Sequence, residues 1–375
     1  MNEAPIRDRA FHLSHPVTDE RLRLRRAWPR DEGHLLLEWE TPHGEPVPGQ
    51  WFADPARLNR AAAATEGAVP LPEEGVLLQP DGADRRLPAL HGLVARADAR
   101  LIAHRPERRA VVRTAEGYAK VVRPERVADL VSRCERAARY ADGAFTVPEL
   151  IRAEDSGVTL WSALPGEPLH ELSRATRVGD PLLAWYRAGA ALAALHAVPA
   201  DGGGGVGPGA HTPADERAAV LRWLGPARRF GLLPDVDPEP ALAPLFEADA
   251  ARIGPVHRDC YDKQFVADPA DERIGLLDMD TLTTGEPALD AANVLVHIAL
   301  RRAQGRLTPG RAEAFRSAFL SGLRPDRETH ERIPAYAAAA RLRLAGVYAF
   351  RPRWRRLARD LMNEALRSSP AAARP

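Results

Sequence analysis

The segment from residue 256 to residue 280 holds the side chains of this sequence that are best suited to chemistry. Asp259 ends a His-Arg-Asp triplet, Gln264 comes five residues later, and Asp278 closes an apolar run after that. Phosphoryl transfer asks little covalent chemistry of a protein. It needs a carboxylate that orients and deprotonates the attacking hydroxyl, and oxygen ligands that hold Mg²⁺ against the phosphates. Asp259, Gln264 and Asp278 could supply these groups.

The two lysines form a second set of candidates. Of the 52 basic residues only Lys120 and Lys263 are lysines, and the rest are arginines. A chain that uses arginine for nearly every positive charge favours the interpretation that a retained lysine serves where a compact ammonium group is needed. Lys263 lies between Asp259 and Gln264, where it could neutralise charge on a transferring phosphoryl group, so we expect a catalytic role for it. A surface role is the alternative.

The elements that could position these residues become clear after residue 96. Three strands, a helix over residues 124–140 and two more strands are expected before a Pro-Gly break at 165–166, and helices dominate after it. This order predicts an α+β fold. We expect a small β-rich lobe over 96–165, a larger helical lobe over 166–375, and an N-terminal cap or extension over 1–95.

The motif around Asp259 resembles that of the aminoglycoside phosphotransferase and choline kinase superfamily, whose members are related to the protein kinases. The family pattern is His-x-Asp, four residues, Asn, a strand, and a hydrophobic pair before a second Asp. This sequence matches it with Gln264 in the asparagine position and Asp278 at the end. Residues 285–290, Gly-Glu-Pro-Ala-Leu-Asp, are similar to the family's Gly-Asp-Pro-Ala-x-Asp. The glutamine departs from the pattern and looks like that of the bacterial maltokinase-type sugar kinases.

This resemblance implies a two-lobed protein-kinase-like fold. It also implies transfer of phosphate from ATP, or another nucleoside triphosphate, to a hydroxyl group of a small molecule. Asp259 would be the catalytic base, and Gln264 and Asp278 would be the ligands of Mg²⁺. The family places a lysine on the third strand of the small lobe and pairs it with a glutamate on the next helix. In this chain these residues are Lys120 and Glu135.

The connection between the lobes and the first hairpin complete the nucleotide site that the resemblance implies. The Pro-Gly break occupies the place of the interlobe hinge, so we expect Ser162 and Leu164 to offer backbone groups to the base. The turn of the first hairpin, residues 104–109, contains three arginines and no glycine. These arginines could reach the phosphates, or they could be solvated turn residues.

Spacing and charge narrow the choice of acceptor. Pro287 comes only nine residues after Asp278, which leaves no room for the long activation segment on which protein kinases bind their substrates. From residue 297 to the end, the sequence has 17 arginines and only 6 acidic residues. This excess of positive charge disfavours a binding site for a polycation. We therefore expect a sugar or amino sugar. Three alternatives stay open: an aminoglycoside-type antibiotic kinase, a peptide-modifying kinase of a natural-product pathway, and a catalytically inactive kinase-like binding protein.

Overall composition excludes several other classes of protein. The formal net charge is +1, so global charge attracts neither nucleic acid nor an anionic membrane. Two cysteines cannot build a disulfide framework, and the sequence shows no long apolar run or signal-peptide pattern. We expect a cytoplasmic protein whose partner is a small molecule. The sequence leaves its oligomeric state open.

Overall fold

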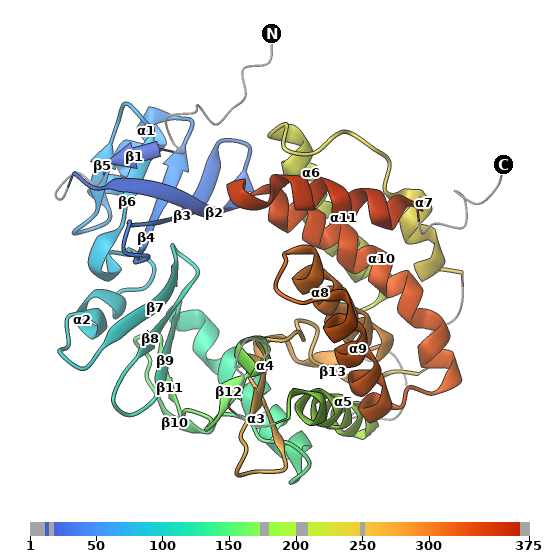
Figure 1. Cartoon of the computed structure of the whole chain (residues 1–375). Coiled ribbons are helices and arrows are strands. Elements are labelled where there is room, and N and C mark those ends of the chain that lie inside the picture. Colours follow the sequence, from blue (N-terminus) through green and yellow to red (C-terminus); the bar gives the residue numbers. More distant parts are fainter. Residues whose placement is uncertain (1–11, 15–18, 173–179, 200–208, 248–251, 368–375) are drawn as a thin grey trace.

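Figure 1 shows the computed structural model, which describes residues 12–14, 19–172, 180–199, 209–247 and 252–367. Two antiparallel sheets lie on one side of the molecule, and a group of helices faces them. No helix in these described segments is long and apolar enough to cross a membrane. The arrangement confirms the prediction of a two-lobed α+β fold that carries extra N-terminal elements.

The N-terminal sheet has six strands in the order β1-β2-β3-β4-β6-β5. In β2 the side chains alternate, so that Leu22 and Leu24 are buried while the arginines beside them are exposed. Leu58 of α1 packs on Phe52 and Leu77 and covers part of the sheet. The elements are β1 (His12–Ser14), β2 (Arg21–Asp31), β3 (His34–Glu40), β4 (Pro46–Phe52), α1 (Pro55–Ala63), β5 (Val69–Leu71), β6 (Val76–Leu78) and the 3₁₀ turn η2 (Pro80–Gly82).

The second sheet has five strands in the order β10-β11-β9-β8-β7. One of its apolar clusters contains Leu87 and Leu90 from the segment that precedes it, and another contains Leu130 of α3. These contacts cover the sheet and hold α3 beside it. The elements are α2 (Leu90–Val94), β7 (Arg100–Arg105), β8 (Arg109–Arg113), β9 (Tyr118–Val122), η3 (Pro124–Arg126), α3 (Val127–Ala141), β10 (Leu150–Ala153) and β11 (Val158–Trp161).

Short strands link this sheet to the helical lobe and carry the turns of interest. Strands β12, β14 and β15 form a three-stranded sheet, and β13 pairs with β16. Their bounds are β12 (Glu167–Pro168), β13 (Gly254–Val256), β14 (Phe265–Ala267), β15 (Ile274–Leu276) and β16 (Thr283–Gly285), with η5 (Met279–Thr281) between the last two.

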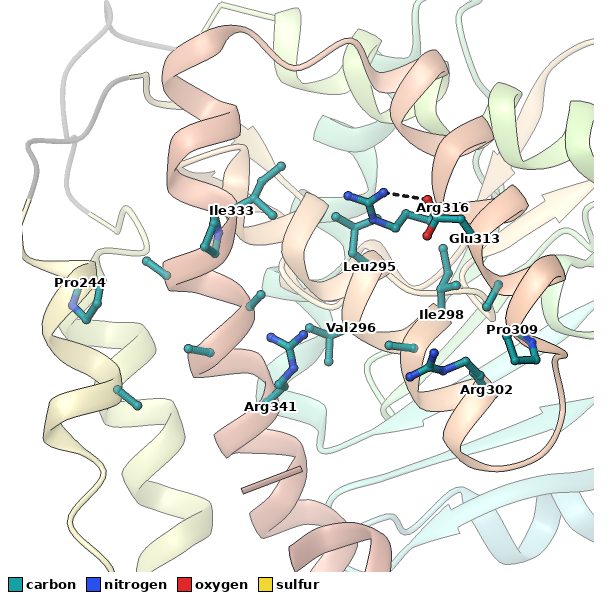
Figure 2. Close-up of a pocket in the computed structure, with 17 residues that line it drawn as sticks. Pro244, Leu295, Val296, Ile298, Arg302, Pro309, Glu313, Arg316, Ile333 and Arg341 are labelled. Atoms are coloured by element: carbon teal, nitrogen blue, oxygen red, sulfur yellow. Dashed lines mark hydrogen bonds and ion pairs between the residues drawn. The ribbon is translucent and has the colours of Figure 1, made fainter. Parts of the chain in front are cut away.

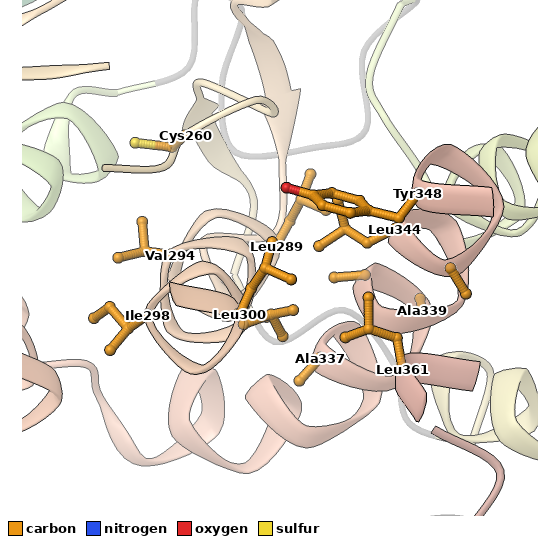
Figure 3. Packing of buried hydrophobic residues seen from close by; sticks show 14 of the residues in the cluster. Cys260, Leu289, Val294, Ile298, Leu300, Ala337, Ala339, Leu344, Tyr348 and Leu361 are labelled. Atoms are coloured by element: carbon orange, nitrogen blue, oxygen red, sulfur yellow. The ribbon is translucent and has the colours of Figure 1, made fainter. Parts of the chain in front are cut away.

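The helical lobe is built around α8 and α10. Figure 3 shows their apolar side chains packed against each other, with Leu361 of α11 and the thiol of Cys260 in the same buried cluster. Because Cys260 directly follows Asp259, this core anchors the predicted catalytic loop. The elements are α4 (Leu169–Leu172), α5 (Pro181–Ala197), α6 (Pro213–Arg229), α7 (Glu239–Leu242), η4 (Ala243–Leu245), α8 (Ala288–Ala303), α9 (Pro309–Leu323), α10 (Arg327–Ala349), η6 (Pro352–Trp354) and α11 (Arg355–Arg367).

The N-terminal region, from β2 to the segment after η2, contacts both lobes. On the helical side, the backbone N–H of Ala27 in β2 donates to the carbonyl of Phe350 at 2.9 Å. On the other side, buried Asp84 accepts hydrogen bonds from Nε2 of His104 at 2.8 Å and from the backbone N–H of Glu107 at 2.7 Å. The turn of the first hairpin is therefore held by the N-terminal region.

Helices α5 and α9 cross with their backbones close together. A Cβ on Gly322 of α9 would overlap the carbonyl oxygen of Tyr186, and one on Gly189 of α5 would overlap that of Phe319. Only glycine fits at these two positions. The crossing matters for function because α5 also carries His196, whose ring contacts the carboxylate of Asp290 at the start of α8.

We expect Gly322→Ala to lower the free energy of unfolding by about 2–3 kcal/mol, because backbone cannot move aside as a flexible side chain can. Gly310→Ala is a matched control in the same helix, where an added Cβ has nothing within 4 Å. It should be neutral or stabilising by up to about 1 kcal/mol. Urea unfolding followed by circular dichroism compares the two variants, and equal losses would contradict a tight α5–α9 contact.

Candidate active site

A cleft of about 480 Å³ lies between the five-stranded sheet and the helical lobe. Both lysines of the chain line this cleft, although they come from opposite lobes. Asp259 lies beside it, close enough to Asp278 and Arg109 for their charges to act on its carboxyl. The residues of the predicted site that line the cleft are Lys120, Ser162, Leu164, Lys263, Gln264 and Asp278.

A buried carboxylate at the start of α8 holds the loop of Asp259. Asp290 accepts hydrogen bonds from the backbone N–H groups of His257 and Arg258, each at 2.7 Å, and contacts Nε2 of His196 at 3.1 Å. Arg258 has a φ of 71°, a left-handed conformation that a non-glycine residue keeps only when its surroundings fix it. Asp290 thus fixes the backbone immediately before Asp259.

His257 connects this loop to the turn that carries Asp278. Its Nε2 donates to the carbonyl of Leu277 at 2.8 Å, and its own carbonyl accepts from Oγ1 of Thr281 at 2.7 Å. Asp278 itself has a φ of 57°. The two carboxylates, Asp259 and Asp278, are therefore positioned by one hydrogen-bonded unit.

The carboxylate of Asp259 is free to accept a proton. Within the described residues it makes no hydrogen bond or ion pair. Burial raises the pKa of Asp259, and the nearby charge of Asp278 raises it further, while Arg343 opposes both effects. A raised pKa makes this carboxylate a stronger base than an exposed aspartate.

Lys120 joins the two sides of the cleft. Its Nζ lies 2.9 Å from Oδ1 of Asp278 and 2.5 Å from Oδ1 of Asp280, and Nη1 of Arg109 lies 3.7 and 3.6 Å from the same two carboxylates. Burial alone would raise the pKa of Asp278, but Lys120 and Arg109 hold it well below its ordinary value. For Asp280, burial and the charge of Asp278 raise the pKa.

Lys120 does not form the predicted ion pair with Glu135. Glu135 is exposed on α3 and does not line the cleft, whereas its neighbour Cys134 does. The helical period places Glu135 at the edge of the apolar stripe, but the orientation of α3 turns the preceding residue toward Lys120. Asp280 provides the second carboxylate that Glu135 was expected to provide.

The hinge side of the cleft is formed by residues that follow β11. The backbone N–H of Ser162 already donates to the carbonyl of Glu149 at 2.9 Å. A backbone contact from Ser162 to a nucleotide base would therefore have to come from its carbonyl. Leu164 places its side chain against Gly275 of β15 and forms part of the cleft wall.

The oxygen donors of the cleft suit Mg²⁺. No group of three or more His, Cys, Asp or Glu side chains in the described part of the chain could hold a metal ion by itself. Asp278, Asp280 and Gln264, whose amide offers a carbonyl oxygen, line the cleft together. Mg²⁺ commonly binds through one or two carboxylates and the phosphates of its substrate, so this donor set fits a metal that arrives with a nucleotide.

A second, larger cavity is distinct from this site. It measures about 560 Å³ and lies between α8, α9 and α10, where Leu295, Ile298 and Arg302 line it (Figure 2). None of the residues of the predicted site borders it. Asn293 and His297, on another face of α8, contact the catalytic loop through the carbonyl of Cys260 and the ring of Tyr261. Helix α8 thus separates the cavity from the loop.

Comparison with known families identifies the kind of enzyme. The model of the phosphotransferase enzyme family matches residues 98–333, a range that includes Lys120, Asp259 and Asp278. This chain belongs to that family. Membership confirms the prediction of an enzyme that transfers phosphate to a hydroxyl group of a small molecule, with a nucleotide as the other substrate. No curated protein matches the sequence.

Several solved structures are similar to this chain. An amicoumacin kinase in complex with AMP-PNP and Ca²⁺ is similar with a TM-score of 0.52 at 12% identity, covering 73% of this chain and 90% of that one. An aminoglycoside phosphotransferase from Streptomyces rimosus, in complex with ADP and streptomycin, gives 0.46 at 21% identity, with 68% and 96% covered. A macrolide 2′-phosphotransferase from Brachybacterium faecium gives 0.44 at 21% identity, with 76% and 96% covered.

Two residues of the site carry roles that sequence reasoning did not assign. Asp290 was identified only as the end of a motif, and its contact with the loop of Asp259 joins positions more than 30 residues apart. Asp280 follows Asp278 by two residues, a spacing that could have indicated a shared lysine. Both roles depend on contacts with segments that are distant along the chain.

We expect Asp280→Asn to raise the KM for the nucleotide about tenfold. Lys120 must leave Asp278 to bind a phosphate group, and the asparagine would lack the negative charge that keeps the lysine in place. Glu135→Gln is the matched control and should leave KM unchanged, since its side chain lies outside the cleft. Steady-state kinetics at several nucleotide concentrations measure both. A loss in Glu135→Gln that equals the loss in Asp280→Asn would contradict this assignment.

Proposed function

We propose that this protein transfers the γ-phosphate of ATP, or of another nucleoside triphosphate, to a hydroxyl group of a sugar or a similar neutral or anionic small molecule, with Mg²⁺ as the metal. One observation carries the proposal. Lys120 of one lobe meets Asp278 and Asp280 of the other, beside the free carboxylate of Asp259. This set of charges is what phosphoryl transfer requires.

Asp259 would act as the base. Its carboxylate would orient the acceptor hydroxyl and take its proton as the oxygen attacks the γ-phosphorus, and the bond from phosphorus to the bridging oxygen of ADP would break. Lys120 would move from Asp278 to the phosphate oxygens while Asp280 keeps it in place. Lys263, which lines the same cleft, would stabilise negative charge on the transferring group.

Asp278 and Gln264 would hold Mg²⁺. A bound metal supplies positive charge that neutralises the phosphates and orients them. In this structure Lys120 lies against Asp278, so the carboxylate becomes available to a metal once the lysine has shifted to the nucleotide. Burial of Gln264 fixes the side chain that replaces the shorter asparagine of the family pattern.

Charges around the catalytic loop support an acceptor that is not a polycation. Arg343 acts on the carboxyl of Asp259, and Lys263 lines the cleft. Positive groups would repel an aminoglycoside that carries several ammonium groups. A sugar hydroxyl meets no such repulsion.

Asp259→Asn should lower kcat by about a hundredfold or more while the affinity for the nucleotide stays similar, because the amide cannot take the proton. The assay is phosphate transfer from ATP with Mg²⁺ to a panel of sugars, amino sugars, aminoglycosides and peptides, followed by mass spectrometry. Transfer to a sugar by the wild type, lost in the variant, is the expected result. Transfer confined to aminoglycosides or peptides would overturn the acceptor class, and full activity of the variant would overturn the role of Asp259.

The raised pKa of Asp259 predicts a pH profile. The base works in its ionised form, so kcat/KM should fall with decreasing pH, with a midpoint above the ordinary carboxyl value of about 4. Arg343→Gln removes a cation that lowers this pKa, so the midpoint should move to higher pH. A midpoint that stays in place in an active Arg343→Gln variant would assign the profile to another group.

A further inference from the structure

A cavity beside the N-terminal sheet carries charged side chains that have no part in the proposed reaction. It measures about 380 Å³ and lies between the β2–β3 turn, α1, the segment after η2 and the turn of the β7–β8 hairpin. We call it the arginine pocket. Five arginines and two carboxylates line it: Arg30, Arg57, Arg60, Arg85, Arg86, Asp31 and Glu107.

The two carboxylates of the arginine pocket leave part of its positive charge unpaired. Arg57 forms a two-pronged contact with Asp31 at 3.0 and 3.1 Å. Arg85 and Arg86 share Glu107, at 2.7 and 3.6 Å. Among the described residues Arg30 has no ion pair, and the carboxylate nearest to Arg60 is Asp54 at 3.9 Å.

The floor of the pocket is fixed by buried polar groups. The ring of His34 stacks on Phe52 at 4.4 Å, and its Nε2 lies 2.7 Å from Oε1 of Gln50. The amide of Gln50 donates to Gln79 at 2.8 Å, and that of Gln79 donates to the carbonyl of Ala83 at 2.8 Å. Since a carbonyl only accepts, the whole chain has one direction, and Nε2 of His34 carries the hydrogen.

This direction leaves Nδ1 of His34 facing Nη2 of Arg57 at 3.4 Å. Burial lowers the pKa of His34, so the ring is neutral near pH 7 and adds an acceptor rather than a charge. Arg57 is therefore held from two sides, by Asp31 and by His34. The pocket has a rigid back wall and carries its free guanidinium groups at the mouth, where Arg30 and Arg60 are exposed.

We propose that the arginine pocket binds a small molecule that carries at least two phosphate groups. Guanidinium groups bind phosphate oxygens through forked, charge-assisted hydrogen bonds. Five of them surround a volume that suits a small organic phosphate. One phosphate would meet Arg30 and Arg60, which lack close partners, and a second would meet Arg85 and Arg86 in competition with Glu107.

The position of Glu107 connects this pocket to the nucleotide cleft. Glu107 has a φ of 57° and lies in the hairpin turn, two residues before Arg109, whose side chain lines the cleft. An anion that draws Arg85 and Arg86 away from Glu107 would change the contacts of the hairpin turn that also carries Arg109. The site is therefore placed to sense phosphorylated metabolites, and this inference holds whatever acceptor the enzyme uses.

Isothermal titration calorimetry with inorganic pyrophosphate tests the proposal. The background is the Lys120→Met variant, in which phosphate binding in the nucleotide cleft is weakened while the arginine pocket is intact. We expect this protein to bind one pyrophosphate, and to bind inorganic phosphate at least tenfold more weakly. Adding Arg30→Gln and Arg60→Gln should weaken pyrophosphate binding about tenfold or more.

Arg356→Gln combined with Arg359→Gln in α11 is the matched control. This double variant removes the same two charges from exposed arginines that lie outside the pocket, and it should leave pyrophosphate affinity unchanged. Circular dichroism checks that each variant is folded. No binding to the Lys120→Met protein at millimolar pyrophosphate would overturn the proposal. So would equal affinities for phosphate and pyrophosphate, or equal losses in the pocket variant and the control.

Discussion

Three carboxylates gathered at one cleft set the main electrostatic constraint of this protein. Burial raises the pKa of both Asp259 and Asp280, and the charge of Asp278 raises both further. Lys120 and Arg109, which come from the opposite lobe, offset the cost of ionising these carboxylates. The same charges that the reaction needs therefore also hold the two lobes together, and a nucleotide would exchange one set of ion pairs for another.

A second constraint is the geometry of the loop before Asp259. Asp290 is buried and is stabilised by two backbone donors and a histidine, which is how a buried charge is retained in a fold. The close crossing of α5 and α9 holds that histidine, and the core between α8 and α10 holds Cys260. Distant parts of the helical lobe thus act together on one short stretch of backbone.

The residues that the sequence proposed for the site and that are close together along the chain lie at or beside one cleft. The spacing of Asp259, Gln264 and Asp278 depends on one loop and one hairpin, and Lys120 could be found because lysine is so rare here. In this structure Lys120 pairs with Asp278 and Asp280 and not with Glu135, because a helical period gives the apolar face but not the angle at which the helix meets the sheet. The arginine pocket could not be predicted, because its residues are spread over four separate segments between positions 30 and 107.

The N-terminal sheet changes how the two lobes can move. In a two-lobed enzyme whose lobes are joined by a single connection, the cleft can open by a hinge rotation at that connection. Here the N-terminal region contacts the hairpin turn at Glu107 through Asp84 and the end of α10 at Phe350 through Ala27 of its sheet. In Figure 1 this region lies opposite the connection near Gly166. Because the lobes are joined on two opposite sides, we expect them to resist separation. Rotation of one lobe relative to the other should then require less energy than opening of the cleft. Substrate exchange through this cleft would then rely on small side-chain and turn displacements rather than on separation of the lobes.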